Sequence, residues 1–291
     1  FIGKYLTKAL LEKGAHVTIF SRNYNNEINS SSKNLKFTSS LSDLNIIKPD
    51  IIINLAGETI SQRWTVNAKK RIYDSRINTT KYIAKYIDQS DKKPSCFISG
   101  SATGYYGISN VIEFDENVNY DSPSSSSFAQ KLCFDWENAA KLLNPDTTRS
   151  VILRIGPVID PAGGLLKNLI LPFKFGLGGM LGNGEQWLSW IDMHDLINLI
   201  IFAIENPNIS GPLNATSPNP VTNSVFSNSL CNLLKRPCKF PYPSFLLKIL
   251  FGQMAEEIML NGQKVLPSKA LANNFCFKYG SIEDSLKRAL I

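Results

Sequence analysis

Long apolar runs and clustered charge are scarce in this sequence, and each absence excludes a class of protein. The chain has 291 residues, but none of its apolar runs approaches the ~20 residues that a membrane-spanning helix requires. Its 31 Lys and Arg against 24 Asp and Glu give a formal charge of +7, yet the basic residues are scattered rather than clustered. We therefore expect neither a membrane nor a nucleic acid as a partner.

Cysteine and histidine are also too few to build a covalent or metal framework. The five cysteines are an odd number and include no Cys-x-x-Cys, and the closest pair is Cys231 and Cys238. This usage favours free thiols in a reducing intracellular compartment, the cytoplasm or an organelle. The two histidines, His16 and His194, cannot complete a metal cluster with those cysteines, so we expect no metal site.

Buried strands alternate with helices along the first half of the chain. An amphipathic helix over residues 1–13 ends at Gly14 and leads into a strand at 16–20. The pattern predicts further strands at 50–57, 95–100 and 150–155, and further helices at 66–87 and 128–143. This α/β alternation predicts a Rossmann-type doubly wound parallel sheet, with ligands at the carboxyl ends of its strands. Because the opening helix and strand are half of a βαβ unit, we expect the sheet's first strand to be missing from this chain.

Two positions near the start are typical of a dinucleotide site. Gly3 lies just ahead of the first helix, where a glycine lets the helix N-terminus approach a diphosphate. Ser21 and Arg22 follow the next strand, where an acidic residue would bind the ribose 2′-hydroxyl of NAD. Arginine there favours a 2′-phosphate, so we expect NADP rather than NAD. The alternative is that Arg22 is a solvated loop charge.

A second arginine, Arg76, is expected to point inward. Ile72, Arg76 and Thr80 recur on one helical face, followed by Ile83 and Ile87. An arginine among apolar side chains needs an anion, which is either a cofactor phosphate or the carboxylate of Asp74 or Glu58. Arg71, on the same helix, is a second candidate for the phosphate.

Several motifs resemble the extended short-chain dehydrogenase/reductase superfamily, and most closely its atypical branch of NAD(P)-binding epimerase-like proteins. They are FIGKYL, INLAGETI, SGSATGYYG, FAQKLCFDWE, LRIGPVI, GGLLKNLILPFKFGLGGMLGNGEQWLSWI and LNGQKVLP. The resemblance implies a cofactor near Gly3, Ser21 and Arg22, with Leu55 and Ala56 at a strand tip. It also implies that Val158 lines the nicotinamide side.

The chain is expected to divide near residue 240. Residues 1–240 are the expected NAD(P)-binding domain, with a substrate-side insertion over 163–190. Residues 241–291 are the expected small C-terminal subdomain. The apolar residues of 243–267 are too few for a core of their own, so we expect them to pack on the Rossmann body and cover the substrate side.

The resemblance is weakest at the catalytic residues. The superfamily uses a serine after the fifth strand, which Ser101 matches, and a tyrosine four residues before a lysine that lowers the tyrosine pKa. No Tyr-x-x-x-Lys occurs in this sequence, and the corresponding helix begins Phe128-Ala-Gln-Lys131. Tyr105 or Tyr106, assisted by Lys131, is the candidate substitute. The alternative is that both tyrosines pack in the core and Lys131 pairs with Asp135.

Two functions follow from these observations. The first is an NADP-dependent oxidoreductase or epimerase-like enzyme for an unidentified small carbonyl or sugar-like substrate. The second is a non-catalytic NADP-binding regulatory or interaction protein. The absent Tyr-x-x-x-Lys favours the second, and the full-length segment 163–190 favours the first. A small-molecule substrate is the expected partner. The sequence leaves open whether the chain also forms a homodimer.

Overall fold

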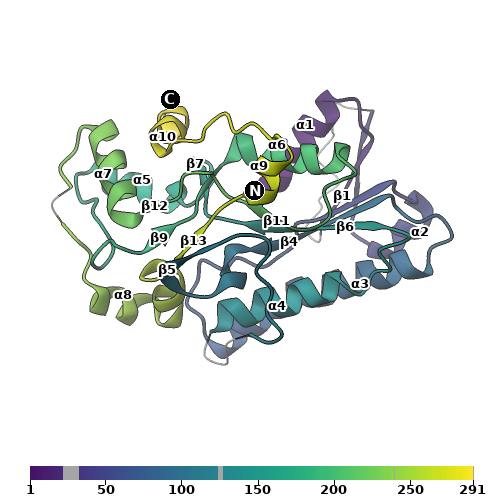
Figure 1. The fold of residues 1–291 in the computed structure, drawn as a ribbon, viewed down its shortest axis with the longest axis horizontal. Coiled ribbons are helices and arrows are strands. Elements are labelled where there is room, and N and C mark those ends of the chain that lie inside the picture. The colour runs from purple at the N-terminus through teal and green to yellow at the C-terminus, as the bar shows by residue number, and fades with distance from the viewer. Residues whose placement is uncertain (22–32, 124–126, 239, 291) are drawn as a thin grey trace.

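A parallel sheet lies at the centre of the computed structural model, which describes residues 1–21, 33–123, 127–238 and 240–290 (Figure 1). Its four strands run in the order β11-β6-β4-β3, and all neighbouring pairs are parallel. They are β3 (Ile51–Asn54), β4 (Cys96–Ala102), β6 (Arg149–Ile155) and β11 (Gly211–Ala215). Residues in the middle of β4 and β6 are buried on both faces, as in most parallel sheets. The expected doubly wound α/β fold is confirmed.

Two further parallel strands pair with each other. They are β1 (Val17–Phe20) and β2 (Leu35–Thr38), in register from Val17–Leu35 to Phe20–Thr38. The helix expected ahead of β1 is confirmed as α1 (Ile2–Glu12), and the chain leaves it through Gly14 at a φ of 81°. Arg22 lies outside the described residues.

Helices cover both faces of the central sheet. Side chains along its strands alternate between the two faces, so apolar residues on each face need a covering layer. On one face, Ile98, Val151 and Leu153 pack against α1 and α6 (Met193–Glu205). On the other face, Phe97 and Ile152 pack against α3 (Val66–Gln89) and α4 (Phe128–Ala140). The shorter elements between them are η1 (Leu41–Asp43), α2 (Leu44–Ile47), η2 (Thr103–Tyr106) and β5 (Ser109–Phe114).

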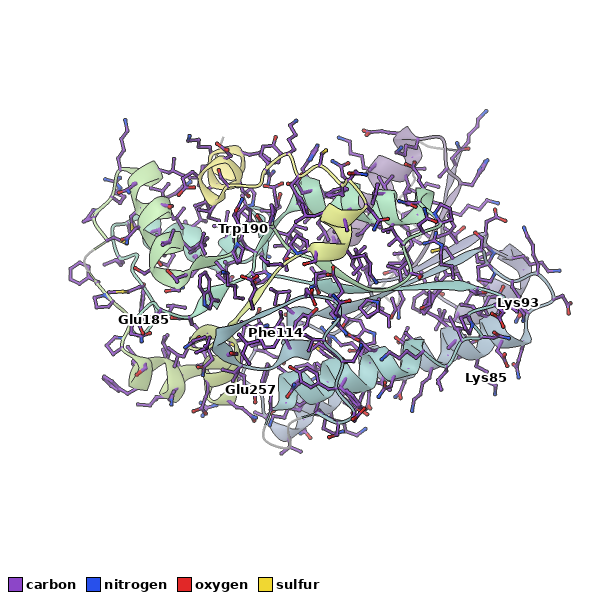
Figure 2. All side chains as sticks on the ribbon, in the orientation of Figure 1. Lys85, Lys93, Phe114, Glu185, Trp190 and Glu257 are labelled. Atoms are coloured by element: carbon purple, nitrogen blue, oxygen red, sulfur yellow. The ribbon has the colours of Figure 1, made fainter. Side chains whose placement is uncertain are left out.

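A second lobe follows the last residues of β6. It consists of β7 (Val158–Asp160), β8 (Gly163–Gly164), α5 (Leu166–Lys174), β9 (Trp187–Leu188), β10 (Ile191–Asp192), β12 (Val221–Thr222) and α7 (Asn223–Leu234). Its core gathers around Trp190 (Figure 2), which is fully buried. Phe173 and Phe226 belong to the same core cluster.

The C-terminal residues run back across both lobes. They form α8 (Ser244–Phe251), a π-helical turn (Ala255–Met259), β13 (Gln263–Val265), α9 (Ser268–Ala272) and α10 (Ile282–Leu290). β13 pairs with β5 next to Phe114, and α10 packs against α7. Glu257 accepts hydrogen bonds from the backbone N–H groups of Phe128 and Ala129, at the start of α4 (Figure 2).

Neither a membrane span nor a metal cluster occurs in the described ranges. No helix there is both long and apolar enough to cross a bilayer. No group of three His, Cys, Asp or Glu side chains there has the arrangement of a metal site.

Candidate active site

The candidate active site is built on three neighbouring parallel strands, near their carboxyl ends. Ser101 of β4 and Asn214 of β11 both lie in register with Arg154 of β6, one on each side. Residues in register on adjacent strands project to the same face of a sheet. The topology therefore brings a hydroxyl, a guanidinium and an amide into one row at the edge where such sheets bind ligands.

Glu137 of α4 completes this row from above the sheet. Its two carboxylate oxygens accept hydrogen bonds from Nε and Nη2 of Arg154, both at 2.9 Å, and Ser101 Oγ donates to the first of them at 2.8 Å. The Glu137 and Arg154 side chains are both 0% exposed. Burial alone would lower the pKa of Arg154, but the hydrogen bonds and charge of Glu137 outweigh burial and raise it. The guanidinium therefore stays charged.

Both candidate tyrosines lie in the η2 turn directly after β4, and both are buried. The guanidinium carbon of Arg154 lies 3.6 Å from the centre of the Tyr105 ring. The Tyr106 hydroxyl accepts a hydrogen bond from Arg154 Nη1 at 2.9 Å and lies 2.7 Å from Asn214 Oδ1. Burial raises the pKa of Tyr106 in spite of the adjacent arginine. This is the opposite of the effect that the superfamily's lysine has on its tyrosine.

Lys131 is not part of this group, which Arg154 forms with Glu137 and the two tyrosines. Its Nζ lies 2.7 Å from Asp135, and its side chain is 58% exposed. The alternative ion pair between these residues is therefore confirmed. The neighbouring Gln130 of α4 does contact a tyrosine, because its Nε2 donates to the backbone carbonyl of Tyr105.

On the cofactor side, Arg76 is held against Gly57. A Cβ atom at Gly57 would lie 2.8 Å from the guanidinium carbon of Arg76, so a larger residue there would displace the guanidinium from this position. Nη1 of Arg76 donates to the backbone carbonyls of Glu58 and Ile72. The alternative ion pairs with Asp74 and Glu58 do not form, and Asp74 pairs with Lys70 instead.

The remaining cofactor candidates lie at the starts or ends of other elements. Leu55 and Ala56 directly follow β3 and are half-buried. Gly3 lies inside the first turn of α1 and not ahead of the helix as expected, because α1 begins at Ile2. Space is open beside it, since an added Cβ would meet nothing within 4 Å. Val158 is buried at the start of β7.

Two other candidates make local contacts. The backbone N–H of Ser21 donates to Thr38, which ties the end of β1 to β2. Arg71 donates to Gln62 at 3.2 Å on the surface.

Sequence reasoning missed Glu137 as well as a second buried network. Asn54 Nδ2 and Trp136 Nε1 both bond to Thr80 Oγ1, at 2.8 and 3.0 Å, and so connect the end of β3 to α3 and α4. The sequence signal for Glu137 was its place beside Trp136 on a helix whose neighbouring positions are apolar. Arg154, inside the apolar strand Val151–Ile155, is the matching opposite charge.

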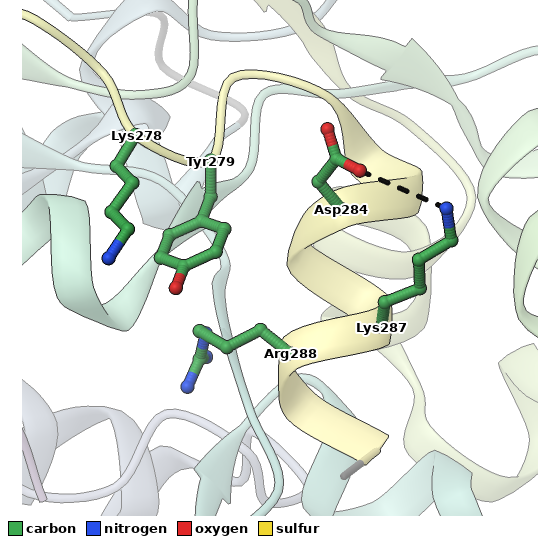
Figure 3. A pocket seen from close by; sticks show the side chains of 5 residues that line it. All are labelled: Lys278, Tyr279, Asp284, Lys287 and Arg288. Carbon is green, nitrogen blue, oxygen red and sulfur yellow. Dashed lines mark ion pairs between the residues drawn. The ribbon is translucent and has the colours of Figure 1, made fainter.

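A hollow of about 470 Å³ lies elsewhere, beside α10 (Figure 3). Lys278, Tyr279, Asp284, Lys287 and Arg288 line it. Two of its cationic side chains form ion pairs within the fold, because Arg288 pairs with the buried Asp192 at 2.8 Å and Lys287 lies 3.9 Å from Asp284. None of these residues belongs to the candidate active site around Ser101, Glu137 and Arg154.

Comparisons with known proteins cover nearly the whole chain. Residues 1–215 match the NAD dependent epimerase/dehydratase family, and residues 242–289 match a domain of unknown function, DUF1731. The epimerase family protein YfhF of Bacillus subtilis is 36% identical over all of this chain and 95% of its own length. The chloroplastic SDR39U1 homolog of Arabidopsis thaliana is 42% identical over 81% of this chain and 67% of its own length.

Solved structures agree with this match. The crystal structure of human epimerase family protein SDR39U1 (isoform 2) with NADPH superimposes with a TM-score of 0.87 at 32% identity. The superposition covers 99% of this chain and 95% of the human chain. UDP-glucuronic acid 4-epimerase from Bacillus cereus, in complex with UDP-glucuronic acid and NAD, has a TM-score of 0.77 at 16% identity and shares the fold.

Proposed function

The chain belongs to the NAD-dependent epimerase/dehydratase family, and on this premise we propose that it binds NADP(H) and transfers hydride to or from a small carbonyl or sugar-like substrate. The observation that carries the proposal is the row of Ser101, Glu137 and Arg154 at the carboxyl ends of the central strands. It places a hydrogen-bonded hydroxyl and a buried carboxylate where this fold binds its ligands.

The residues around the site fit a dinucleotide. Open space beside Gly3 adjoins the first turn of α1, which has no side-chain cap and no acidic residue. Both hydrogen bonds of Arg76 within the described residues use Nη1, which leaves Nε and Nη2 for a phosphate oxygen. Burial lowers the pKa of Arg76, so an anionic partner would relieve the cost of its buried charge.

The chain's own groups provide a route for a proton. A bound nicotinamide would supply or accept the hydride. Ser101 Oγ donates to Glu137 Oε1 at 2.8 Å, so Glu137 can accept the proton of Ser101 when Ser101 takes one from a substrate hydroxyl. In the reverse direction, Glu137 returns a proton to Ser101 as Ser101 protonates a substrate oxygen. Arg154 holds the carboxylate in place through two hydrogen bonds.

The preference for NADP(H) over NAD(H) rests on Ser21 and Arg22, which follow β1 where an acidic residue would bind a ribose 2′-hydroxyl. The human relative was crystallised with NADPH. Calorimetry should find tighter binding of NADPH than of NADH. Arg22→Ala should cost about 1–3 kcal/mol with NADPH and little with NADH. Equal affinities of the unsubstituted protein for the two cofactors would refute this preference.

Catalysis is tested by NADPH oxidation with a panel of small carbonyl compounds and keto sugars. Ser101→Ala should lower turnover about 100-fold or more, on the scale of general acid–base catalysis, without weakening NADPH binding. Ser150→Ala is the matched control, because Ser150 Oγ lies buried in β6 without a hydrogen-bond partner among the described residues. Equal turnover by the two variants would exclude Ser101 as the proton-transfer group. NADPH binding without turnover of any compound would instead favour the regulatory function.

A further inference from the structure

The C-terminal end of α7 turns the chain back on itself and brings two cysteines together. Lys235 adopts the left-handed conformation, with a φ of 52°. Its backbone N–H donates to Asn232, and the next N–H, from Arg236, donates to Cys231. This pair of bonds is the Schellman arrangement, which reverses the chain at the end of a helix. Cys238, two residues beyond Arg236, therefore returns alongside the last turns of α7.

The two thiols occupy neighbouring places on this returning segment. Cys238 Sγ lies 3.5 Å from the backbone carbonyl of Ser227, one helical turn before Cys231. Cys231 Sγ lies 3.8 Å from the carbonyl of Pro237, the residue that precedes Cys238. Burial raises the pKa of Cys231 to about 12, and a hydrogen bond with the Cys238 thiol adds to this effect. These two contacts thus hold the thiols on adjoining segments.

The two cysteines differ in access to solvent. Cys231 is buried in the core of the second lobe, with Phe226 and Leu230, whereas Cys238 is half-buried at the surface. A dissolved oxidant therefore reaches Cys238 first, and Cys231 is placed to react second. Such an accessible thiol with a neighbouring resolving thiol is the arrangement found in reversible protein disulfides.

We propose that Cys231 and Cys238 are a redox modification site that closes to a disulfide when the chain meets a small-molecule disulfide such as oxidised glutathione. The Cys238 thiolate attacks one sulfur of oxidised glutathione, forms a mixed disulfide and releases one glutathione thiolate. Cys231 then loses its proton and attacks the sulfur of Cys238, which releases the second glutathione. The protein dithiol is oxidised, one molecule of oxidised glutathione is reduced to two thiols, and excess reduced glutathione reverses the reaction.

The disulfide would tether the connection between α7 and α8 to the body of the second lobe. This connection also contacts the end of α5 and the segment after it, because Arg236 Nε donates to the carbonyl of Lys174 and the N–H of Tyr242 donates to the carbonyl of Met180. Pro241 and Pro243 of the connection line a hollow of about 560 Å³ together with Gly182 and Leu260. Oxidation would therefore fix one wall of that hollow to α7.

The test uses the full chain with Cys276→Ser, because Cys276 is exposed and would form glutathione adducts of its own. Of the five cysteines, this variant keeps four. After incubation with oxidised glutathione, thiol titration of the denatured protein should find two of those four thiols lost. Mass spectrometry of the non-reduced digest should find the Cys231 and Cys238 peptides joined, and dithiothreitol should restore all four thiols.

Two further variants separate the two steps. With Cys231→Ser added, the reaction should stop at a glutathione adduct on Cys238. With Cys238→Ser added, the buried Cys231 should stay unmodified. Adducts on both cysteines without a joined peptide, four intact thiols, or disulfides only between chains would each overturn the proposal. The Cys276→Ser protein alone distinguishes these outcomes, even if either added substitution prevents folding.

Discussion

The guanidinium of Arg154 and the carboxylate of Glu137 face each other through two hydrogen bonds of 2.9 Å, and solvent reaches neither side chain. A charge pair in this position can be replaced as a pair with little loss, but removal of one member leaves the other charged and buried. Because Arg154 lies in β6 and Glu137 in α4, the pair joins these two elements. It also orients Ser101, which donates a hydrogen bond to the same carboxylate.

Glu137→Gln should destabilise the protein by about 3–5 kcal/mol, because Arg154 would keep its charge without a carboxylate. Urea unfolding followed by circular dichroism measures this loss. Asp74→Asn is the matched control, since it breaks the exposed pair with Lys70 and should cost far less than Glu137→Gln. Equal losses in the two variants would contradict the role given to the buried pair.

Phenylalanine substitutions of the two tyrosines should have unequal effects. Tyr106→Phe removes the hydroxyl that bonds to Arg154 and Asn214, and leaving these buried groups unpaired should cost about 1–3 kcal/mol. Tyr105→Phe keeps the ring that covers Arg154 and, among the described residues, removes only a 3.3 Å contact to the N–H of Tyr120. It should therefore cost less than Tyr106→Phe in thermal and urea unfolding.

The same two variants test the tyrosines as proton donors. Turnover of a carbonyl substrate that survives both substitutions would reject both phenols as donors and leave Ser101 with Glu137. Loss of turnover in Tyr105→Phe, with its stability retained, would identify Tyr105 as the donor.

Elements with a strong local pattern could be predicted from the sequence. The helix expected over 66–87 spans Val66–Gln89, and the strand expected at 95–100 spans Cys96–Ala102. Their apolar periodicity is set within one element, so no knowledge of distant segments is needed. By contrast, β5 pairs with β13, about 150 residues away in the chain. A strand whose partner is so remote, and whose Val111 and Ile112 side chains are exposed, has no clear local signature.

The candidate site was predictable only in part for the same reason. Ser101 could be placed from its position at the end of a buried strand, and Arg76 from its helical face. The partners of these residues depend on the packing of α3 and α4 on the sheet. Glu137 pairs with Arg154, and Gly57 makes room for Arg76. Neither relation follows from spacing along the chain, because each joins two elements whose relative orientation only the folded structure defines.

Leu286→Ala should destabilise the whole protein and not just its C-terminus. Leu286 of α10 is fully buried beside Trp190 and Phe226 of the second lobe. The loss should be about 2–5 kcal/mol, the cost of a cavity at a buried leucine. Val111→Ala is the control, because Val111 is 94% exposed and should change stability by no more than about 0.5 kcal/mol. A small loss in Leu286→Ala, or a separate unfolding transition for the C-terminus, would contradict a shared core.

The buried thiol of Cys133 should make the protein sensitive to alkali. Burial raises the pKa of Cys133 from its ordinary value of 9.0 to about 12, so the folded chain holds this proton more tightly than the unfolded chain. The resulting stability is complete below pH 9 and is lost as the pH rises toward 12. Compared with Cys133→Ala, the wild-type protein should therefore lose about 1.4 kcal/mol of relative stability for each pH unit above 9.

Urea unfolding at pH 8, 9 and 10 measures this difference, since the contributions of tyrosines and lysines that titrate in both proteins cancel. Parallel stability curves for the wild type and Cys133→Ala would mean that Cys133 ionises as readily in the folded chain as in the unfolded one.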